Sequence, residues 1–191
     1  MRKTRKAAAI LTAAAMAAAS AMPVMADEIK DLYDYETQAR EVETWNILHS
    51  QNAADLNVLT NLYDGLVEAD EYGKVVPAIA ESWETEDNGI TWTFHLREGV
   101  KWVDQNGNEK GEVTAQDFLT GLEWILNFHK NDATNTSMPM EMIVGAEDYY
   151  NMTSELDADA GFALTAESPE FADTVGIKAI DDYTLQYTCV S

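Results

Sequence analysis

The sequence predicts a mixed α/β fold, with helices and strands of the α+β type around one hydrophobic core. Apolar and polar side chains alternate from Ile90 to Arg97, which is the period of a strand with one buried face. Apolar side chains recur at helical spacing from Thr114 to His129, and the runs 176–180 and 183–189 are predicted to be two more strands. Without the leader described next, about 165 residues remain, which is enough for one core but not for two large lobes.

The first 26 residues are expected to be a secretory signal peptide. A basic head at 2–6 precedes an apolar run at 7–21, and small residues at 24–26 form a cleavage site. The apolar run is too short to span a membrane as a helix. No cysteine lies near the cleavage site, so we expect export to the periplasm or cell surface without a lipid anchor at this end. Residues 27–40 are expected to be a flexible segment before a domain at 41–191.

The charge of the chain limits its partners. After removal of the leader, 8 basic and 34 acidic residues remain, a net charge of −26. Nucleic acids and anionic membranes attract basic patches, so both are unlikely partners on this charge. Cys189 is the single cysteine, so no internal disulfide can form, and we expect it to be a small buried strand residue.

Several elements are predicted before the alternating strand. Residues 41–48 are expected to form a first strand, and a helix is predicted over 55–66 with Asp55 as its N-cap. The apolar face of this helix would consist of Leu56, Leu59, Leu62, Tyr63 and Leu66. Residues 72–74 are a predicted turn, and Pro77 suits either an edge strand or the first turn of a short helix over 78–81.

A β-hairpin is predicted around Asp87-Asn88-Gly89. The strand 82–86 precedes this tripeptide, which supplies the positive-φ residues that a tight turn needs, and the alternating strand follows it. Trp83, Trp92 and Trp102 could form a platform on which a ligand stacks, but aromatic side chains in strands more often pack in the core or across strands. We expect the packing role.

A polar turn and a helix are expected after the hairpin. The turn 104–111 has the alternating oxygen side chains of a calcium loop, but Glu109 replaces the glycine and Ala115 the glutamate that such a loop requires. Thr114 and Asp117 resemble a capping box that opens a helix ending at His129, whose imidazolium would favour the negative helix end. Its apolar stripe would consist of Phe118, Leu122, Ile125 and His129, with Leu119 and Leu126 beside it.

The remaining segments have a weaker periodicity of apolar residues. A loop is expected over 130–139, a second helix over 141–155, and a flexible acidic loop over 156–168. No sequence motif indicates catalysis or metal binding: the histidines 49, 95 and 129 lie far apart, and no nucleophile elbow, zinc motif or phosphate loop occurs. The sequence therefore predicts no cofactor.

Four blocks in order carry a resemblance to a known family. The chain reads NLYDGLV at 61–67, VPAIAESW at 76–83, TWTFHLREGVKW at 91–102 and VTAQDF at 113–118. These blocks, together with GIKAIDDYTLQYT at 176–188, resemble the N-terminal region of family 5 extracellular solute-binding proteins, the oligopeptide- and dipeptide-type receptors of ABC importers. The resemblance extends from about residue 41, although Thr44-Trp45-Asn46 differs from the usual Leu-Asp-Pro.

The resemblance implies a fold and a function. Family members have two lobes that enclose a peptide, so this chain would be a partial first lobe of a periplasmic-binding-protein-like (class II) fold. The ligand-binding residues would be His49, Ser50, Gln51, Asn52 and Ala53, which would hold the peptide backbone while hydrated pockets accept its side chains. Arg97 is expected to pair with carboxylates near its turn. The implied partners are a short peptide and a membrane permease, and no chemical reaction is implied.

Other readings of the sequence are open at this point. Related receptors take nickel complexes, sugars or opines in place of peptides. The chain could also be part of a secreted hydrolase whose catalytic residues lie beyond Ser191, or a surface protein that uses its acidic lobe to bind other proteins.

Overall fold

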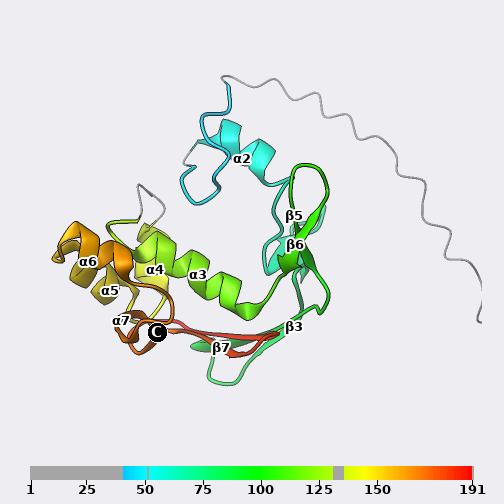
Figure 1. The fold of residues 1–191 in the computed structure, drawn as a ribbon. Coiled ribbons are helices and arrows are strands. Elements are labelled where there is room, and N and C mark those ends of the chain that lie inside the picture. Colours follow the sequence, from blue (N-terminus) through cyan, green and yellow to red (C-terminus); the bar gives the residue numbers. More distant parts are fainter. Residues whose placement is uncertain (1–40, 51, 131–135, 191) are drawn as a thin grey trace, which may run out of the picture. The chain divides into compact units, whose positions relative to one another are not determined.

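The computed structural model describes residues 41–50, 52–130 and 136–190, and it confirms the mixed α/β class (Figure 1). The predicted leader 1–26 and segment 27–40 lie outside the described residues, as does Gln51. The helices are α2 (Ala53–Leu59), α3 (Ala115–Leu126), α4 (Ser137–Met142), α5 (Ala146–Ser154), α6 (Ala158–Ala163) and α7 (Pro169–Ala172). The strands are β1 (Val67–Ala69), β2 (Val75–Pro77), β3 (Ala80–Thr85), β4 (Thr91–Leu96), β5 (Lys101–Val103), β6 (Glu109–Glu112), β7 (Ile177–Asp181) and β8 (Thr184–Thr188).

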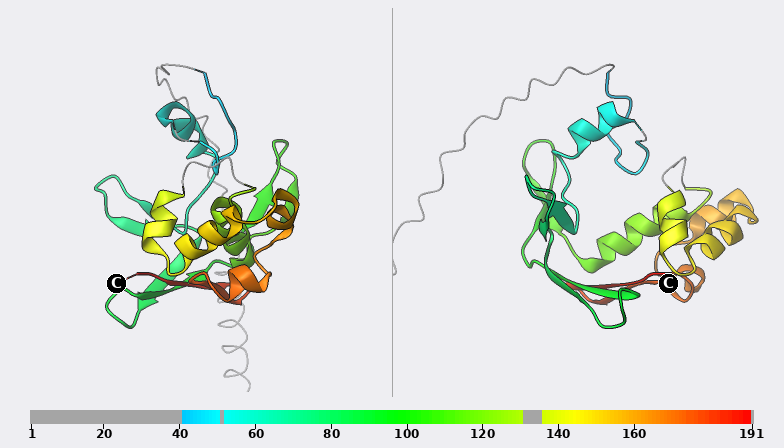
Figure 2. Two further views of the ribbon diagram at one scale, coloured as in Figure 1. Left: turned by 90° about the vertical axis from the view of Figure 1, so that its left-hand side faces the viewer. Right: turned by 180° about the vertical axis from the view of Figure 1, so that it is seen from behind.

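The largest sheet joins two hairpins that are far apart in the sequence. Its order is β3-β4-β8-β7, with every neighbouring pair antiparallel (Figure 2). The predicted turn between β3 and β4 is confirmed, since Asn88 and Gly89 have φ of 59° and 90°. The pairing of β4 with β8 places Phe94 opposite Leu185, and both side chains contribute to the core. The two strands predicted near the end of the chain thus complete the sheet.

Two smaller hairpins, β1–β2 and β5–β6, have turns where the sequence predicts them, although the predicted turn 104–111 is shorter than expected because β6 begins at Glu109. Gly73 and Gly107 adopt φ of 76° and 77° in them. Pro77 ends the edge strand β2, so of the two predictions for this proline the edge strand is confirmed, and β3 takes the place of the short helix. The Asp104 carboxylate accepts the N–H groups of Asn106 and Asn108, as in an ordinary surface turn. In the described part of the chain, no group of three His, Cys, Asp or Glu side chains could hold a metal ion.

Helix α3 packs against the sheet and supplies much of the core. The predicted capping box is present: the Thr114 side chain accepts the Asp117 backbone N–H, and the Asp117 carboxylate accepts the Thr114 backbone N–H at 2.8 Å. The core includes Leu119, Leu122 and Leu126. The helix ends at Leu126, so the prediction that it continues to His129 was wrong, and His129 does not lie at the helix end. None of the described helices is long and apolar enough to cross a membrane.

The buried face of α3 is shifted by about one residue along the sequence from the predicted apolar stripe. Glu123, which the sequence pattern placed outside the stripe, is buried beside the leucines, whereas Phe118 and Ile125 are half-buried. Apolar periodicity could not show this, because the partners that allow a carboxylate to be buried come from later parts of the chain.

The aromatic side chains of the β3–β4 hairpin pack across strands, as expected. Trp83 lies opposite Phe94, and the Phe94 ring meets the Tyr187 ring edge-on at 6.1 Å between centroids. Trp92 is half-buried, and its indole N–H donates to the Gly89 carbonyl at 2.8 Å. Trp102, in the two-stranded β5–β6 sheet, is 42% exposed, and the residue opposite it is Gly111, which has no side chain. The expected packing in the core or across strands was therefore wrong for this residue.

The region 137–172 differs most from its prediction. Helix α4 begins at Ser137, so the prediction of a loop up to Pro139 was wrong, and it ends at Met142. The predicted helix 141–155 is interrupted at Gly145, which adopts φ of 71°, and α5 forms its remaining part. The segment 156–168, predicted to be a flexible loop, contains α6 and buries Gly161 and Ala166. Small residues carry little apolar signal, and α6 is positioned by the Asn127 amide, which donates to the Gly161 carbonyl at 2.9 Å. The expectation of a buried strand residue was wrong for Cys189, which is half-buried and follows the end of β8, where it pairs with Ile143 in an isolated bridge.

Candidate functional site

The segment 41–50 is irregular, and the prediction of a first strand over 41–48 was wrong. The Thr44 hydroxyl accepts the Asn46 N–H at 3.1 Å, and the Asn46 side chain accepts the Leu48 N–H at 3.0 Å. The Asn46 carbonyl accepts the N–H groups of His49 and Ser50. Such side-chain acceptors compete with strand pairing and fold this segment into a turn.

Helix α2 begins earlier and ends earlier than predicted. Its N-cap is Asn52, whose side-chain oxygen accepts the Asp55 N–H at 2.8 Å, so the prediction of Asp55 as N-cap was wrong. The helix ends at Leu59, which is buried. The predicted apolar face is therefore incomplete, since Leu56, Leu62 and Tyr63 are exposed.

The Asp55 carboxylate is the centre of this region. It has no exposed surface, and one of its oxygens accepts the Glu43 N–H at 2.8 Å. The other oxygen accepts the Asn52 amide at 2.8 Å and the Ser50 hydroxyl at 3.2 Å. Burial by itself would raise the pKa of Asp55, but the hydrogen bonds from Glu43, Ser50 and Asn52 outweigh it and lower the pKa. The carboxylate therefore stays charged and holds three points of the chain together.

Four of the five predicted ligand-binding residues lie in the described part of the chain. Ser50 is buried and Asn52 half-buried, and both side chains bind Asp55. His49 is half-buried, and Ala53 is the exposed first residue of α2. Gln51 lies outside the described residues. Asp55 was predicted only as an N-cap, although Asn52 followed three residues later by an acid is a capping-box spacing that could have indicated its role.

Arg97 has a different partner from the one expected. Its Nε donates to the Ala78 carbonyl at 2.8 Å, so it binds a backbone group, and the expected pairing with a carboxylate was wrong. The nearby Glu112 joins the β5–β6 hairpin to the large sheet. It accepts Lys101 Nζ at 2.7 Å, the Gly99 N–H at 2.8 Å and the Tyr183 hydroxyl at 2.5 Å.

These contacts make Glu112 a source of acid sensitivity. The ion pair with Lys101, followed by the Tyr183 and Gly99 hydrogen bonds, lowers the pKa of Glu112 from 4.5 to about 2. A carboxyl whose pKa is lowered by folding stabilises the folded chain above its unfolded pKa and loses that effect as the pH falls through the folded pKa. The stabilisation by Glu112 should therefore be complete near pH 7 and decline between pH 4.5 and about 2.

A comparison of thermal melts tests this expectation. Glu112→Gln should melt below the wild type at pH 7, and the difference between the two midpoints should shrink as the pH falls towards 2. Glu109→Gln, an exposed change in the same hairpin, is the control. A midpoint difference that is the same at pH 7 and pH 2 would contradict the assignment.

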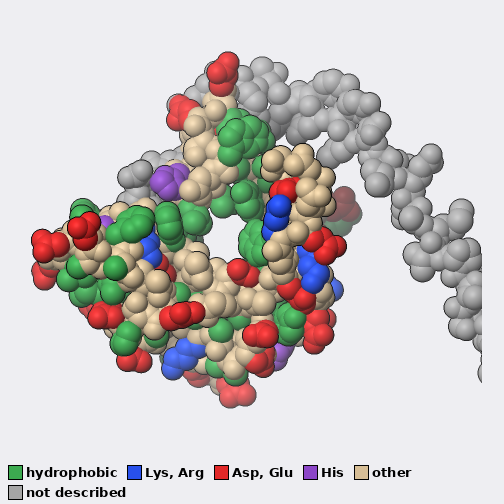
Figure 3. Space-filling model, viewed as in Figure 1, with side chains coloured by type: hydrophobic (Ala, Val, Ile, Leu, Met, Phe, Trp, Pro, Cys, Tyr) green, Lys and Arg blue, Asp and Glu red, His purple; other side chains and the backbone are tan. Residues whose placement is uncertain are grey.

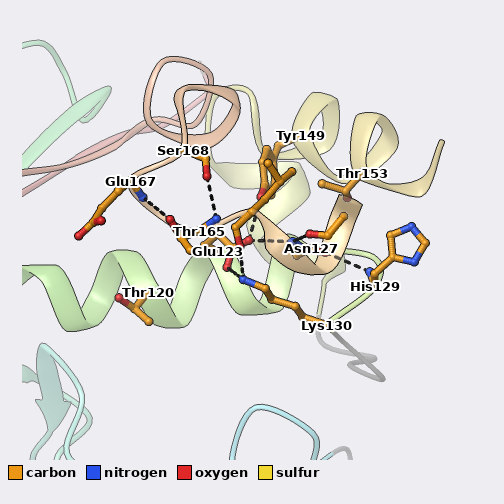
Figure 4. Close-up of polar contacts among 12 residues, drawn as sticks. Thr120, Glu123, Asn127, His129, Lys130, Tyr149, Thr153, Thr165, Glu167 and Ser168 are labelled. Atoms are coloured by element: carbon orange, nitrogen blue, oxygen red, sulfur yellow. Dashed lines mark hydrogen bonds and ion pairs between the residues drawn. The ribbon is translucent and has the colours of Figure 1, made fainter. Parts of the chain in front are cut away.

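A second polar cluster is buried between α3, α5 and the segment after α6 (Figure 4). Glu123, which is 2% exposed, accepts the Tyr149 hydroxyl, the Asn127 amide and Lys130 Nζ, each at 2.8 Å. Lys130 also donates to the Leu164 carbonyl. Burial, followed by the hydrogen bond to Glu123, raises the pKa of Tyr149, so this hydroxyl remains a donor. The contacts of Glu123 with Tyr149, Asn127 and Lys130 join parts of the same core, which indicates a structural role and not a ligand site.

A family model and curated relatives match this chain. The model described as bacterial extracellular solute-binding proteins, family 5 Middle, matches residues 74–190. The oligopeptide-binding proteins AliB and AmiA of Streptococcus pneumoniae are 35% and 36% identical over 83% and 94% of this chain, and they match over 21% and 24% of their own length. The periplasmic oligopeptide-binding protein OppA of Escherichia coli is 30% identical over 78% of this chain and 23% of its own.

Solved structures show the same fold. An oligopeptide ABC transporter substrate-binding domain from Bacillus anthracis matches with a TM-score of 0.61 and 27% identity, over 81% of this chain and 25% of its own. Listeria monocytogenes OppA bound to peptide matches with a TM-score of 0.59 and 26% identity, over 77% of this chain and 25% of its own. The chain thus spans between a fifth and a quarter of the length of these relatives.

Proposed function

The chain belongs to the bacterial extracellular solute-binding proteins of family 5, and we propose that it is part of a receptor that captures short peptides for an ABC importer. The membership confirms the resemblance that the four sequence blocks carry. The observation that carries the proposal is the match of nearly the whole chain to relatives that are named for oligopeptide binding. Haemophilus influenzae OppA, which is 27% identical with a TM-score of 0.56, was solved in complex with the nonapeptide RPPGFSPFR.

We place the peptide against His49, Ser50, Asn52 and Ala53, with Gln51 included from the sequence. The Ser50 and Asn52 side chains are bound to Asp55, so this segment has mainly backbone groups to offer to a ligand. Backbone hydrogen bonds give affinity for an extended peptide without reading its side chains, and water-filled pockets adapt to different residues. The geometry thus favours a receptor of broad peptide specificity.

The proposal extends to the partners and the location of the protein. Residues 1–26 direct export, and residues 41–191 form the first part of the solute-binding domain. Closure of two lobes over the peptide would be the signal that a membrane permease receives. Figure 3 shows Asp and Glu side chains over much of the visible face, with few Lys and Arg among them, which disfavours nucleic acid. The receptor would bind its peptide without chemical turnover and without a cofactor.

Peptide retention by the full-length gene product tests the function. The purified protein should retain RPPGFSPFR, or short peptides from a mixed digest, in native mass spectrometry and calorimetry. It should release each peptide uncleaved. Failure to retain any peptide would contradict the proposal, and cleavage would favour the hydrolase reading.

A substitution at the exposed Ala53 tests the site. Ala53→Tyr adds a large side chain next to the proposed peptide path and should weaken binding at least about tenfold, which corresponds to about 1.4 kcal/mol. Asn57→Tyr, on an exposed part of the same helix, is the matched control and should bind as the wild type does. Equal affinity of all three proteins would place the peptide elsewhere.

A further inference from the structure

The buried carboxylate of Asp55 joins three separated points of the segment before α2. Glu43 lies 12 residues before it, Ser50 five and Asn52 three, and all three donate to its two oxygens. The contact with Glu43 is made through the backbone N–H, so it fixes the path of the chain and not only a side chain. The Asn52 amide nitrogen also lies 3.5 Å from the Glu43 carboxylate, which is a second contact between these two residues' parts of the chain.

This arrangement replaces the support that regular structure would give. Among residues 41–50 and 52, the structure has no helix or strand, so no ladder of backbone hydrogen bonds fixes the chain there. A buried carboxylate has about four acceptor positions, and burial makes each lost partner costly. One side chain in the first turn of α2 can therefore fix the positions of Glu43, Ser50 and Asn52 relative to one another.

We infer that Asp55 is a positioning residue for peptide capture: it holds Glu43, Ser50 and Asn52 in the arrangement that presents the backbone of residues 49, 50, 52 and 53 to the ligand. The inference rests on the proposed function, because it assigns Asp55 a role at that same site. Asp55 acts through its neighbours, since its carboxylate is fully covered. A loop that is ordered before binding does not lose conformational freedom when the ligand arrives, and the affinity is correspondingly higher.

Two variants of the full-length protein separate positioning from general stability. Asp55→Asn keeps one oxygen for the Glu43 N–H but turns the other into an NH₂ group that faces the Asn52 amide. Ser50→Ala removes one donor and leaves the carboxylate in place. Asp87→Ala is the matched control: Asp87 also accepts an N–H and a hydroxyl, both from Thr91, but in the β3–β4 turn.

The experiment measures affinity for RPPGFSPFR and amide hydrogen exchange at Glu43, at a temperature well below melting. Asp55→Asn should bind about tenfold more weakly, the ratio expected for the loss of about one hydrogen bond, and its Glu43 amide should exchange faster. Ser50→Ala should show a smaller loss of affinity, whereas Asp87→Ala should bind as the wild type does and keep its Glu43 amide protected.

Each result bears on a different claim. If Asp55→Asn melts earlier but binds the peptide as the wild type does, Asp55 serves stability alone and the inference is overturned. If Asp55→Asn does not fold, unchanged affinity and unchanged Glu43 exchange in Ser50→Ala overturn it. A wild-type protein that retains no peptide overturns the proposed function, and Glu43 exchange then decides by itself whether Asp55 orders the loop.

Discussion

Glu123→Ala should destabilise the folded chain by about 3–5 kcal/mol, because it leaves the Lys130 charge buried without its partner. The change also removes the acceptor of the Tyr149 hydroxyl and the Asn127 amide. Lys130 is only 9% exposed, so water cannot readily replace the lost carboxylate. Urea denaturation followed by circular dichroism measures the difference, and the transition midpoint should fall with little change in slope.

A double-mutant cycle separates the ion pair from the loss of packing. Glu123→Leu and Lys130→Met should each be destabilising, whereas the double variant should lose less than the sum of the two, since no unpaired charge remains buried. Glu147→Ala, an exposed acid in the first turn of α5, is the control and should stay within about 0.5 kcal/mol of the wild type. Additive losses in the cycle would show that the two charges are not coupled.

Gly145→Ala should be nearly as damaging, with a loss of roughly 2–5 kcal/mol from backbone strain and a steric clash together. Gly145 has φ of 71° between α4 and α5, and a Cβ there would lie 2.0 Å from the Thr174 carbonyl oxygen. The backbone has little room to shift, because Val144, the residue before Gly145, is tied to the strand region: its carbonyl accepts the Gly176 N–H at 2.8 Å. The expected result is a large fall in the melting temperature.

Gly73→Ala isolates the part of this loss that comes from backbone strain. Gly73 has φ of 76° in the β1–β2 turn, but a Cβ there would meet nothing within 4 Å. This variant should therefore lose only about 1–2 kcal/mol. Equal losses for the two glycines would mean that the close approach of residues 145 and 174 does not matter.

Local patterns predicted much of the fold. The β3–β4 hairpin, the strands β7 and β8 and the start of α3 follow from periodicity and turn chemistry, which act between residues a few positions apart. The conformation of the loops was harder to predict from the sequence. The segment 41–48 has a strand-like composition, yet hydrogen bonds to the Thr44 and Asn46 side chains fold it into a turn. For the candidate site, the resemblance indicated residues 49–53, and the capping-box spacing of Asn52 and Asp55 was a local signal for Asp55. The bond from the Glu43 N–H, 12 residues earlier in the chain, had no such signal.

The sequence by itself determined the family, the two long hairpins and the helix α3, because these depend on the order of residues along short stretches. Only the tertiary structure decided which polar groups are buried. Glu123 meets Tyr149 26 residues later, and Asp55 meets the Glu43 backbone 12 residues earlier. A buried charge is stable only when such distant partners surround it, and the sequence of a single segment does not contain them.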